Sequence, residues 1–201
     1  NIAAGKTTVL NHIQSKYPNI EVKTEPIDHW TNVKGFNLLE ALYTQSERWT
    51  FTFEFYALLC RVKDYQLASN NHNNNKIKCF ERSLLSNKHV FIRHAYNEQS
   101  LNEVEYELLN QYFEYALTKI DYSQTAILFL DLIPEQCYER LIKRARDAEK
   151  IIDLKRLEKL HHYYDDFLKK IDICEVKRID AAQPVEDVFK QVDCVLDELV
   201  Q

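Results

Sequence analysis

The feature that most restricts the fold is a run of apolar residues at 125–130 (TAILFL), which has the length of a strand. A continuous apolar run of this kind predicts a parallel strand that is buried on both faces. Further short strands are predicted at 20–24, 77–80 and 176–179. Helical periodicity occupies the intervening segments, at 5–16, 36–43, 47–68, 101–119, 134–145, 154–169 and 185–199. Strands that alternate with helices predict a single α/β domain with a parallel sheet and right-handed crossovers.

The composition argues against several classes of function. A length of 201 residues suits one globular domain, and a net charge of −5 argues against a surface that coats nucleic acid. The sequence shows neither an apolar stretch of membrane-span length nor a signal-peptide pattern. We therefore expect no nucleic-acid or membrane partner, and a cytoplasmic protein, or a mitochondrial one if a targeting segment preceded Asn1. Five scattered cysteines without a CxxC pair predict free thiols in a reducing compartment.

The first seven residues, NIAAGKT, fit the last seven positions of the phosphate-binding loop G-x-x-x-x-G-K-[ST]. Backbone N–H groups and a helix N-terminus cradle phosphates in such a loop. Lys6 would bridge the β- and γ-phosphates of a nucleotide, and the Thr7 hydroxyl would hold Mg²⁺. Taken alone, the motif could also be a helix that merely starts with Gly-Lys-Thr. With no leading glycine and no methionine, we expect a fragment whose first strand and natural N-terminus are missing.

Five motifs occur along the chain in a fixed order, namely NIAAGKTT, TEPIDHW, ERWTFTFEFYALLCR, FERSLLS and RLIKRARDAE. In this order and spacing they resemble the deoxynucleoside kinase family, with the closest match to its deoxycytidine and deoxyguanosine kinases. The resemblance implies a P-loop kinase fold, in which helices flank a parallel β-sheet and residues 140–150 form a lid. It also implies a homodimer that transfers the γ-phosphate of ATP, with Mg²⁺, to the 5′-hydroxyl of a deoxynucleoside in nucleotide salvage.

Three residues at the ends of predicted strands match catalytic positions of the family. By resemblance, Glu25 is the general base that takes the proton of the 5′-hydroxyl, and Glu81 helps to hold Mg²⁺. Arg82 would contact the base carboxylate and the 5′-oxygen, and an arginine beside a carboxylate keeps that carboxylate ionised. The alternatives are a surface carboxylate at a strand end and a structural salt bridge at the sheet edge.

A second group of residues would bind the phosphates of ATP. In the N-terminal loop the resemblance assigns this role to Ala3, Ala4, Gly5, Lys6, Thr7 and Thr8. A basic cluster at 140–146 would form the lid, in which Arg140, Arg144 and Arg146 occupy the phosphate-contacting positions. Positive charge at a closing lid neutralises the transferring phosphoryl group and excludes water. Without the other motifs, the same cluster would be interpreted as a solvated helix face.

A third group would bind the sugar and the base. Glu149 matches the position that binds the 3′-hydroxyl, with Tyr43 as its partner, although Glu149 could equally be an exposed carboxylate of the lid. Aromatic rings pack well on flat bases, and the expected walls of the base pocket are Trp30, Phe53 and Phe91, with Leu39 and Leu42 beside them. Core packing is the competing interpretation for the two phenylalanines.

The base-reading position departs from the family, because it holds Glu54 where glutamine is usual. Arg61 lies two helical turns further along the same face, and Asn87 occupies a position where aspartate is common. An ionised Glu54 only accepts hydrogen bonds, which suits the two adjacent donors of guanine, and Arg61 could donate to the guanine carbonyl or N7. Deoxyguanosine, deoxycytidine or deoxyadenosine is therefore expected over thymidine, whose methyl group Arg61 would crowd. Alternatively, Arg61 simply pairs with Glu54.

Fold alone does not establish function, so two further classes stay open. One is a catalytically inactive, kinase-like structural subunit of a larger complex. The other is a P-loop kinase for a different small metabolite. The presence of Lys6, Glu25, Arg82 and the lid arginines argues against the first, because a structural subunit has no reason to retain this set. The aromatic base-pocket residues and Tyr43 argue against the second.

Overall fold

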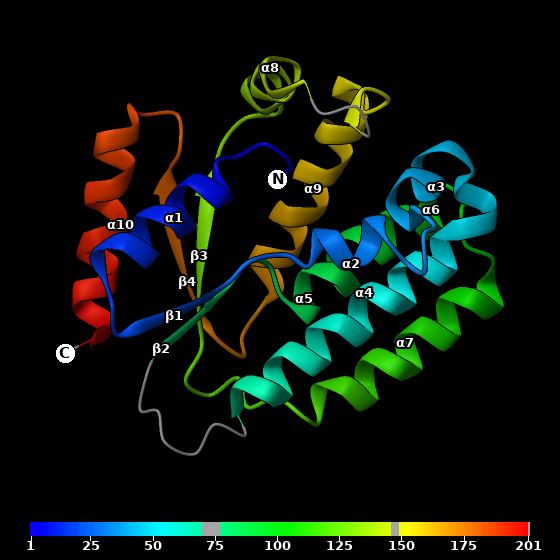
Figure 1. The fold of residues 1–201 in the computed structure, drawn as a ribbon, viewed down its shortest axis with the longest axis horizontal. Coiled ribbons are helices and arrows are strands. Elements are labelled where there is room, and N and C mark those ends of the chain that lie inside the picture. The colour runs from blue at the N-terminus through cyan, green and yellow to red at the C-terminus, as the bar shows by residue number, and fades with distance from the viewer. Residues whose placement is uncertain (70–76, 146–148, 201) are drawn as a thin grey trace.

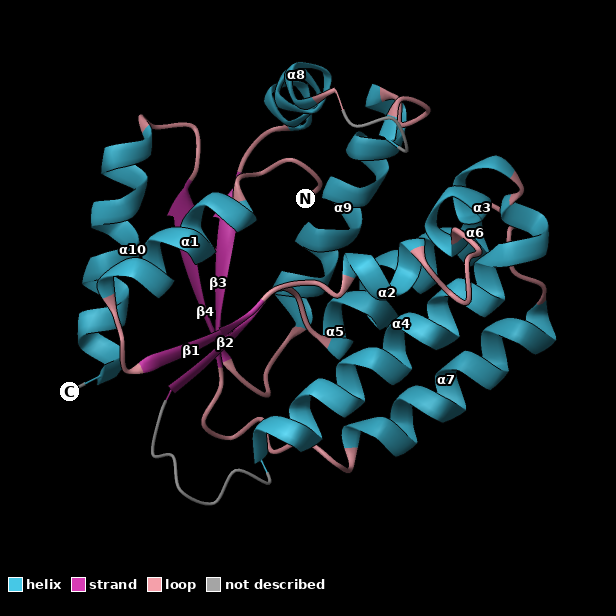
Figure 2. Cartoon of the chain, viewed as in Figure 1, coloured by secondary structure: helices cyan, strands magenta, loops and turns pink. Residues whose placement is uncertain are grey.

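A computed structural model describes residues 1–69, 77–145 and 149–200 of the chain (Figures 1 and 2). Arg146 and the asparagine-rich stretch at 70–75 lie outside the described residues. The strands are β1 (Ile20–Lys23), β2 (Ile77–Phe80), β3 (Ala126–Asp131) and β4 (Glu175–Asp180). All four predicted strands are therefore present, to within a residue or so at each end.

The strands form two parallel pairs, β1 with β2 and β3 with β4. In the part of the chain that the structure describes, no ladder joins the two pairs. The expectation that the apolar run is buried on both faces is only half right. Phe129 and Leu130 are buried, whereas Ile127 and Leu128 are partly exposed, because in the described residues β4 covers one edge of β3 and no second strand covers the other.

The seven predicted helices are all present. They are α1 (Lys6–Lys16), α3 (Leu38–Thr44), α4 (Ser46–Ser69), α7 (Glu103–Leu117), α8 (Pro134–Arg144), α9 (Leu154–Lys170) and α10 (Val185–Val200). Local chemistry sets several of their starts. Asn102 begins α7 with a reciprocal capping box to Glu105, and the Asp153 side chain accepts from the N–H of Arg156 at the start of α9.

Four short helical elements were not predicted. They are α2 (Ile27–Thr31), α5 (Leu84–Ser86), the π-helix η1 (Asn87–Ile92) and α6 (Arg93–Asn97). The last three form a continuous segment that packs between α4, α7 and α9. In this segment Leu84, Leu85, Val90 and Ile92 are buried almost completely. The spacing of these buried residues fits neither the α-helical nor the strand period, and periodicity therefore did not predict the segment.

The elements are arranged so that the strand ends meet in the middle of the molecule. Figure 1 shows α1 and α10 beside the strands on one side, and α3, α4, α6 and α7 gathered on the other. The main core joins both parts, and a smaller apolar cluster forms beneath α2 and α3 from Trp30, Leu38, Leu42, Phe53 and Ala57. Both sides therefore border the region beyond the carboxyl ends of the strands, where open α/β sheets bind ligands.

All five cysteines are free thiols. Cys60 and Cys137 are buried, and Cys194 is exposed. Among the described residues, no helix is both long enough and apolar enough to cross a bilayer.

Candidate active site

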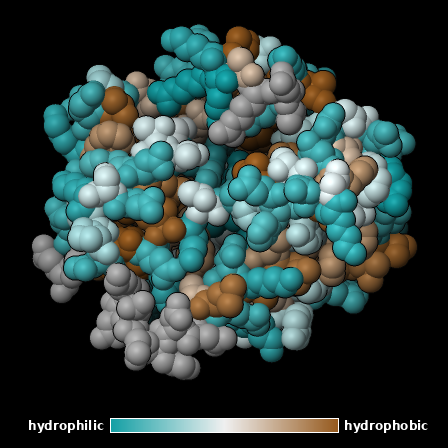
Figure 3. All heavy atoms as spheres, in the orientation of Figure 1, coloured by the Kyte–Doolittle hydropathy of each residue, from teal (hydrophilic) through white to brown (hydrophobic). Residues whose placement is uncertain are grey.

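One large cavity collects the predicted site residues. Its volume is about 1380 Å³, above the roughly 300–1000 Å³ of a pocket for one small ligand, so two ligands can lie in it side by side. Figure 3 shows the surface hollowed between the part that carries α1 and the part that carries α3 and α4. The predicted residues that line the cavity are Ala3, Ala4, Gly5, Lys6, Thr7, Thr8, Glu25, Trp30, Leu39, Leu42, Tyr43, Phe53, Glu54, Arg61, Glu81, Arg82, Asn87, Phe91, Arg140, Arg144 and Glu149. Arg146, the remaining site residue, lies outside the described residues.

The N-terminal loop wraps the start of α1 in the manner expected of a phosphate loop. Gly5 precedes the helix with a φ of 99°, and Ala3 also has a positive φ, of 60°. Such left-handed backbone turns successive N–H groups toward the same side of a loop and forms an anion-binding concavity. The side chain of Lys6 donates to the carbonyl oxygen of Asn1 at 3.1 Å, which holds its ammonium group over the loop.

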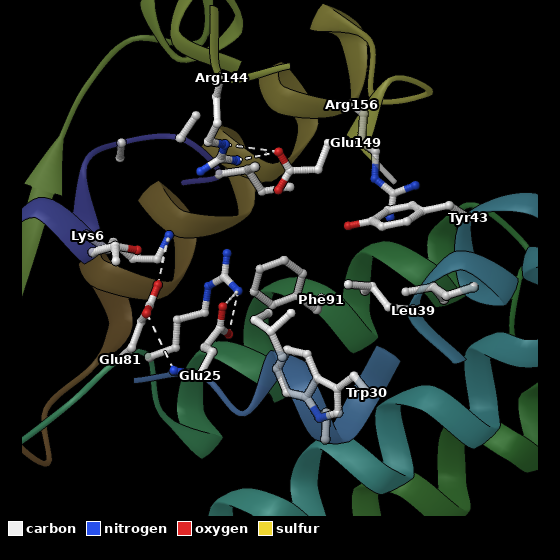
Figure 4. Close-up of a pocket in the computed structure, with 18 of the residues that line it drawn as sticks. Lys6, Glu25, Trp30, Leu39, Tyr43, Glu81, Phe91, Arg144, Glu149 and Arg156 are labelled. Carbon is white, nitrogen blue, oxygen red and sulfur yellow. Dashed lines mark hydrogen bonds and ion pairs between the residues drawn. The ribbon is translucent and has the colours of Figure 1, made fainter. Parts of the chain in front are cut away.

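Lys6 faces an acidic partner at the end of β2. Its Nζ lies 3.7 Å from Oε1 of Glu81, and Figure 4 shows both side chains on the loop side of the cavity. Burial, with the nearby charge of Arg82, lowers the pKa of Lys6 to about 8, against the opposing effect of Glu25 and Glu81. A carboxylate and the Thr7 hydroxyl beside one loop are oxygen ligands of the type that Mg²⁺ accepts together with phosphates. These residues therefore fit the ion, although among the described residues no group of three or more His, Cys, Asp or Glu side chains could enclose a metal.

Glu25 lies at the centre of the cavity and binds two arginines. Nη1 of Arg82 donates to Oε1 at 2.6 Å and to Oε2 at 2.7 Å, and Nη2 of Arg61 donates to Oε1 at 2.7 Å. Burial alone would raise the pKa of Glu25, but the charges of Arg82, Arg61 and Lys6 lower it to about 2. The carboxylate is therefore ionised throughout the physiological pH range, as the sequence predicts for an acid beside Arg82.

Arg82 is held in an unusual backbone conformation. Its φ is 64°, which costs an L-residue roughly 1–2 kcal/mol. Its guanidinium carbon lies 4.8 Å from the centre of the Phe91 ring, a cation–π contact. Strained residues of this kind persist where the surrounding contacts fix them and cluster at functional sites. The two bonds to Glu25 and the Phe91 ring together fix the direction of Arg82.

The lid residues reach the site from α8 and the segment after it. Nη2 of Arg140 donates to the carbonyl of Ala181 at 2.8 Å, and its Nη1 lies 3.5 Å from the carbonyl of Ala4 in the N-terminal loop. Arg144 binds Oε2 of Glu149 through Nε at 3.1 Å and through Nη2 at 2.6 Å. Arg144 and Glu149 were assigned to different ligands, the phosphates and the sugar, and here they pair with each other.

The opposite end of the cavity is an aromatic pocket. Trp30 is 4% exposed and meets Phe53 edge to face, with ring centres 5.3 Å apart. Figure 4 shows Phe91, Leu39 and Tyr43 on the same side as Trp30. The pocket is therefore walled by rings and aliphatic side chains, as a site for a flat base requires.

Of the two partners expected for Arg61, the structure contradicts the direct pair with Glu54, and the contact with a base stays a prediction. Its Nε donates to Oδ1 of Asn87 at 2.6 Å, its Nη1 to the backbone carbonyl of Glu81 at 2.7 Å, and its Nη2 to Glu25. The expected pair with Glu54 is absent, because Asn87 stands between the two side chains and donates from Nδ2 to Oε2 of Glu54 at 3.2 Å. All three nitrogens of the guanidinium are thus engaged by protein atoms, although its five N–H groups outnumber these three bonds.

Glu54 is a buried acid, and within the described part of the chain its side chain is hydrogen-bonded to the neutral amide of Asn87. It is 5% exposed. Burial raises its pKa to about 7, although the bond from Asn87 and the charges of Arg61, Arg156 and Arg82 act in the opposite direction. The assumption that Glu54 is fully ionised at neutral pH is therefore not supported.

Sequence reasoning missed several cavity residues on α9 and before α7. Arg156 places its guanidinium carbon 5.3 Å from the centre of the Tyr43 ring, and Lys159 binds Glu98 at 2.6 Å. On α9 these cations occur in a highly charged helix, which is typical of a solvated face. The sequence carried no signal that separates Arg156 from its charged neighbours.

Comparison with known proteins gives one family. The sequence profile named deoxynucleoside kinase matches residues 1–201. Human mitochondrial thymidine kinase 2 is 36% identical over 173 residues, which cover 85% of this chain and 62% of that protein. Human deoxycytidine kinase is 33% identical over 189 residues (84% and 72%), and mitochondrial deoxyguanosine kinase of Xenopus laevis is 30% identical over 192 residues (85% and 71%). The chain thus spans less than two thirds of the thymidine kinase that it matches, and the identities do not single out one base.

Proposed function

Because the chain belongs to the deoxynucleoside kinase family, we propose that it transfers the γ-phosphate of ATP to the 5′-hydroxyl of a deoxynucleoside in nucleotide salvage. The observation that carries this proposal is the order of groups along one cavity. The N-terminal loop with Lys6 lies at one end, the aromatic side chain of Trp30 at the other, and Glu25 between them (Figure 4), where it accepts hydrogen bonds from Arg82. A nucleotide and a nucleoside bound at the two ends would meet at Glu25.

In the proposed reaction the 5′-oxygen attacks the γ-phosphorus in line, and the bond from that phosphorus to the β–γ bridging oxygen breaks. ADP leaves, and the hydroxyl proton passes to the carboxylate of Glu25. Phosphoryl transfer needs mainly positioning and charge neutralisation, so even a weakly basic carboxylate suffices to orient the hydroxyl and receive its proton late in the step. Arg82 and Lys6 would stabilise the charge on the transferring group.

Mg²⁺, when bound with ATP, would neutralise charge on the β- and γ-phosphates. We propose that Glu81 and Thr7 hold it. The lid arginines Arg140 and Arg144 would complete the phosphate site, the latter by leaving Glu149 when ATP enters. Glu149 would then be released toward the sugar, where Tyr43 is its proposed partner on the 3′-hydroxyl.

For the base, we propose deoxyguanosine, deoxycytidine or deoxyadenosine over thymidine. The support is that Glu54 and Arg61 both line the cavity, where the bulk of Arg61 would crowd the methyl group of thymine. The likeness to thymidine kinase 2 favours thymidine instead, so all four deoxynucleosides belong in the assay. We further propose a cytoplasmic or mitochondrial homodimer, and the exposed apolar side chains of Val104, Leu108 and Tyr115 on α7 are candidates for the contact.

The proposal is tested by incubating the chain with ATP, Mg²⁺ and each of the four deoxynucleosides, and by measuring monophosphate formation by chromatography. Lys6→Ala should lose at least about 100-fold in rate. Lys16→Ala is the matched control, because Lys16 ends the same helix and forms its ion pair with Asp193 away from the cavity. Folded protein that binds ATP but phosphorylates none of the four would favour the inactive structural subunit or a different substrate.

A further inference from the structure

The orientation of the Asn87 amide determines how Glu54 can bind a base. Arginine can only donate hydrogen bonds, so the oxygen of the amide must face Nε of Arg61, at 2.6 Å. The nitrogen of the amide then faces Glu54 and donates to Oε2. Oε2 is therefore fixed as an acceptor, and Oε1 is the oxygen of Glu54 that is left for the proton of the acid form.

Among the described residues, no cation forms an ion pair with Glu54, and the hydrogen bond from Asn87 is the direct contact that favours its carboxylate form. The side chain is 5% exposed and lines the base end of the cavity. Arg61, which lies two turns further along the same helix, forms its ion pair with Glu25 instead. The other charged groups that act on Glu54 are Arg156 on α9 and Arg82 after β2, and arginines keep their charge at every relevant pH.

The two protonation states offer different hydrogen bonds. As a neutral acid, Glu54 donates from Oε1 and accepts at Oε2, which is the pattern of a glutamine amide. Cytosine and adenine present a ring acceptor next to an amino donor, so they match the acid. As a carboxylate, Glu54 accepts at both oxygens, and it then matches the adjacent ring N–H and amino group of guanine.

We propose that Glu54 is a specificity switch, which binds cytosine or adenine as a carboxylic acid and guanine as a carboxylate, so that the preferred deoxynucleoside changes with pH. The inference rests on the proposed function. Burial places the pKa of Glu54 near 7, so the change falls in the neutral range. In that range the neutral bases themselves do not titrate, and the selection depends on the protein.

The test compares the Kd of deoxyguanosine and deoxycytidine by calorimetry at about pH 6 and about pH 8. For the wild type, the ratio of the two affinities should move toward deoxyguanosine by up to about tenfold per pH unit, because it follows the ratio of the carboxylate to the acid. Glu54→Gln should show a ratio that is constant with pH. Glu47→Gln is the matched control, since it makes the same change on an exposed turn of α4 and should behave as the wild type does.

A ratio that is constant with pH in the wild type would overturn the proposal, as would an equal pH dependence in Glu54→Gln. Binding of neither nucleoside would instead remove the proposed function, and the switch with it. Infrared spectra of the wild type give a second readout that needs no variant. Bound deoxycytidine should retain a carboxylic acid band at neutral pH, and bound deoxyguanosine should abolish it. The same spectrum with both ligands would contradict the proposal.

Discussion

Nη1 of Arg82 donates hydrogen bonds to both carboxylate oxygens of Glu25, at 2.6 and 2.7 Å. Glu25 follows β1 and Arg82 follows β2, so this pair links the carboxyl ends of two neighbouring strands. It also aims a carboxylate and a guanidinium at the same point of the cavity. A hydroxyl that accepts from Arg82 and donates to Glu25 would be oriented for attack on a phosphate held by Lys6.

The proposed phosphate-binding role of the N-terminal loop predicts that substitutions of two glycines differ in their effect on the KM for ATP. Gly5→Ala places an alanine at a φ of 99°, and its added Cβ lies beside Nη1 of Arg140. Gly35→Ala places an alanine at a φ of 88°, with no atom within 4 Å of the added Cβ. Both variants should lose about 1 kcal/mol of stability. Only Gly5→Ala should also raise the KM for ATP, because only Gly5 shapes the loop. Denaturant unfolding and initial rates measure the two effects, and an equal KM in both variants would contradict the assignment of the loop.

The depressed pKa of Lys6 predicts an alkaline limb in the pH profile. The value of about 8 means that Lys6 loses its charge as the pH rises through 8, so kcat/KM for ATP should fall there. Bound phosphates favour the charged form, and kcat at saturating ATP should stay level to higher pH. Lys6→Arg keeps its charge and should shift or abolish the limb. If kcat/KM for ATP falls at the same pH in Lys6→Arg, the fall is caused by the titration of another group.

The proposed sugar-binding role of Tyr43 is tested with a nucleoside that lacks the 3′-hydroxyl. Tyr43→Phe keeps the ring under Arg156 and removes only the phenolic oxygen. The KM for the deoxynucleoside should rise about three- to tenfold, the cost of one hydrogen bond, while the KM for the 2′,3′-dideoxynucleoside should stay unchanged. Tyr56→Phe, on α4 and outside the cavity lining, is the control. An equal rise for both substrates would mean that Tyr43 acts by packing.

The buried acid also predicts a change of stability with pH. The pKa of Glu54 is raised in the folded state from 4.5 to about 7, so the fold loses stability as the pH rises across that interval. Glu54→Gln does not titrate and should be more stable than the wild type by up to about 3 kcal/mol at pH 8. The difference should shrink toward zero near pH 4.5. Urea unfolding at several pH values measures it, and a difference that does not vary with pH would show that Glu54 is not a neutral acid.

The regular elements could be predicted because their signals are local. The apolar stripe of Val9, Leu10 and Ile13 defines α1, and all three residues are buried. The segment 84–97 could not be predicted, because η1 interrupts the α-helical period between two short helices. Periodicity has no template for such a change of pitch.

The site shows the same division between local and distant information. The sequence placed Glu54 and Arg61 on one helical face, and both side chains are buried there. It could not show that Glu25, in the segment after β1, forms the ion pair with Arg61, or that Asn87 lies between Arg61 and Glu54. Those contacts join residues 26 to 36 positions apart in the chain, so they depend on the assembled fold.

The rate of 5′-monophosphate formation by Glu25→Gln, relative to wild type, tests the central claim most directly. The substitution keeps the size of the side chain and removes the acceptor of the hydroxyl proton. We expect wild-type protein to convert at least one deoxynucleoside to its 5′-monophosphate, and the variant to be slower by about 100-fold or more while it still binds ATP in calorimetry. A variant as fast as wild type, or a wild type that binds ATP and forms no monophosphate, would contradict the account.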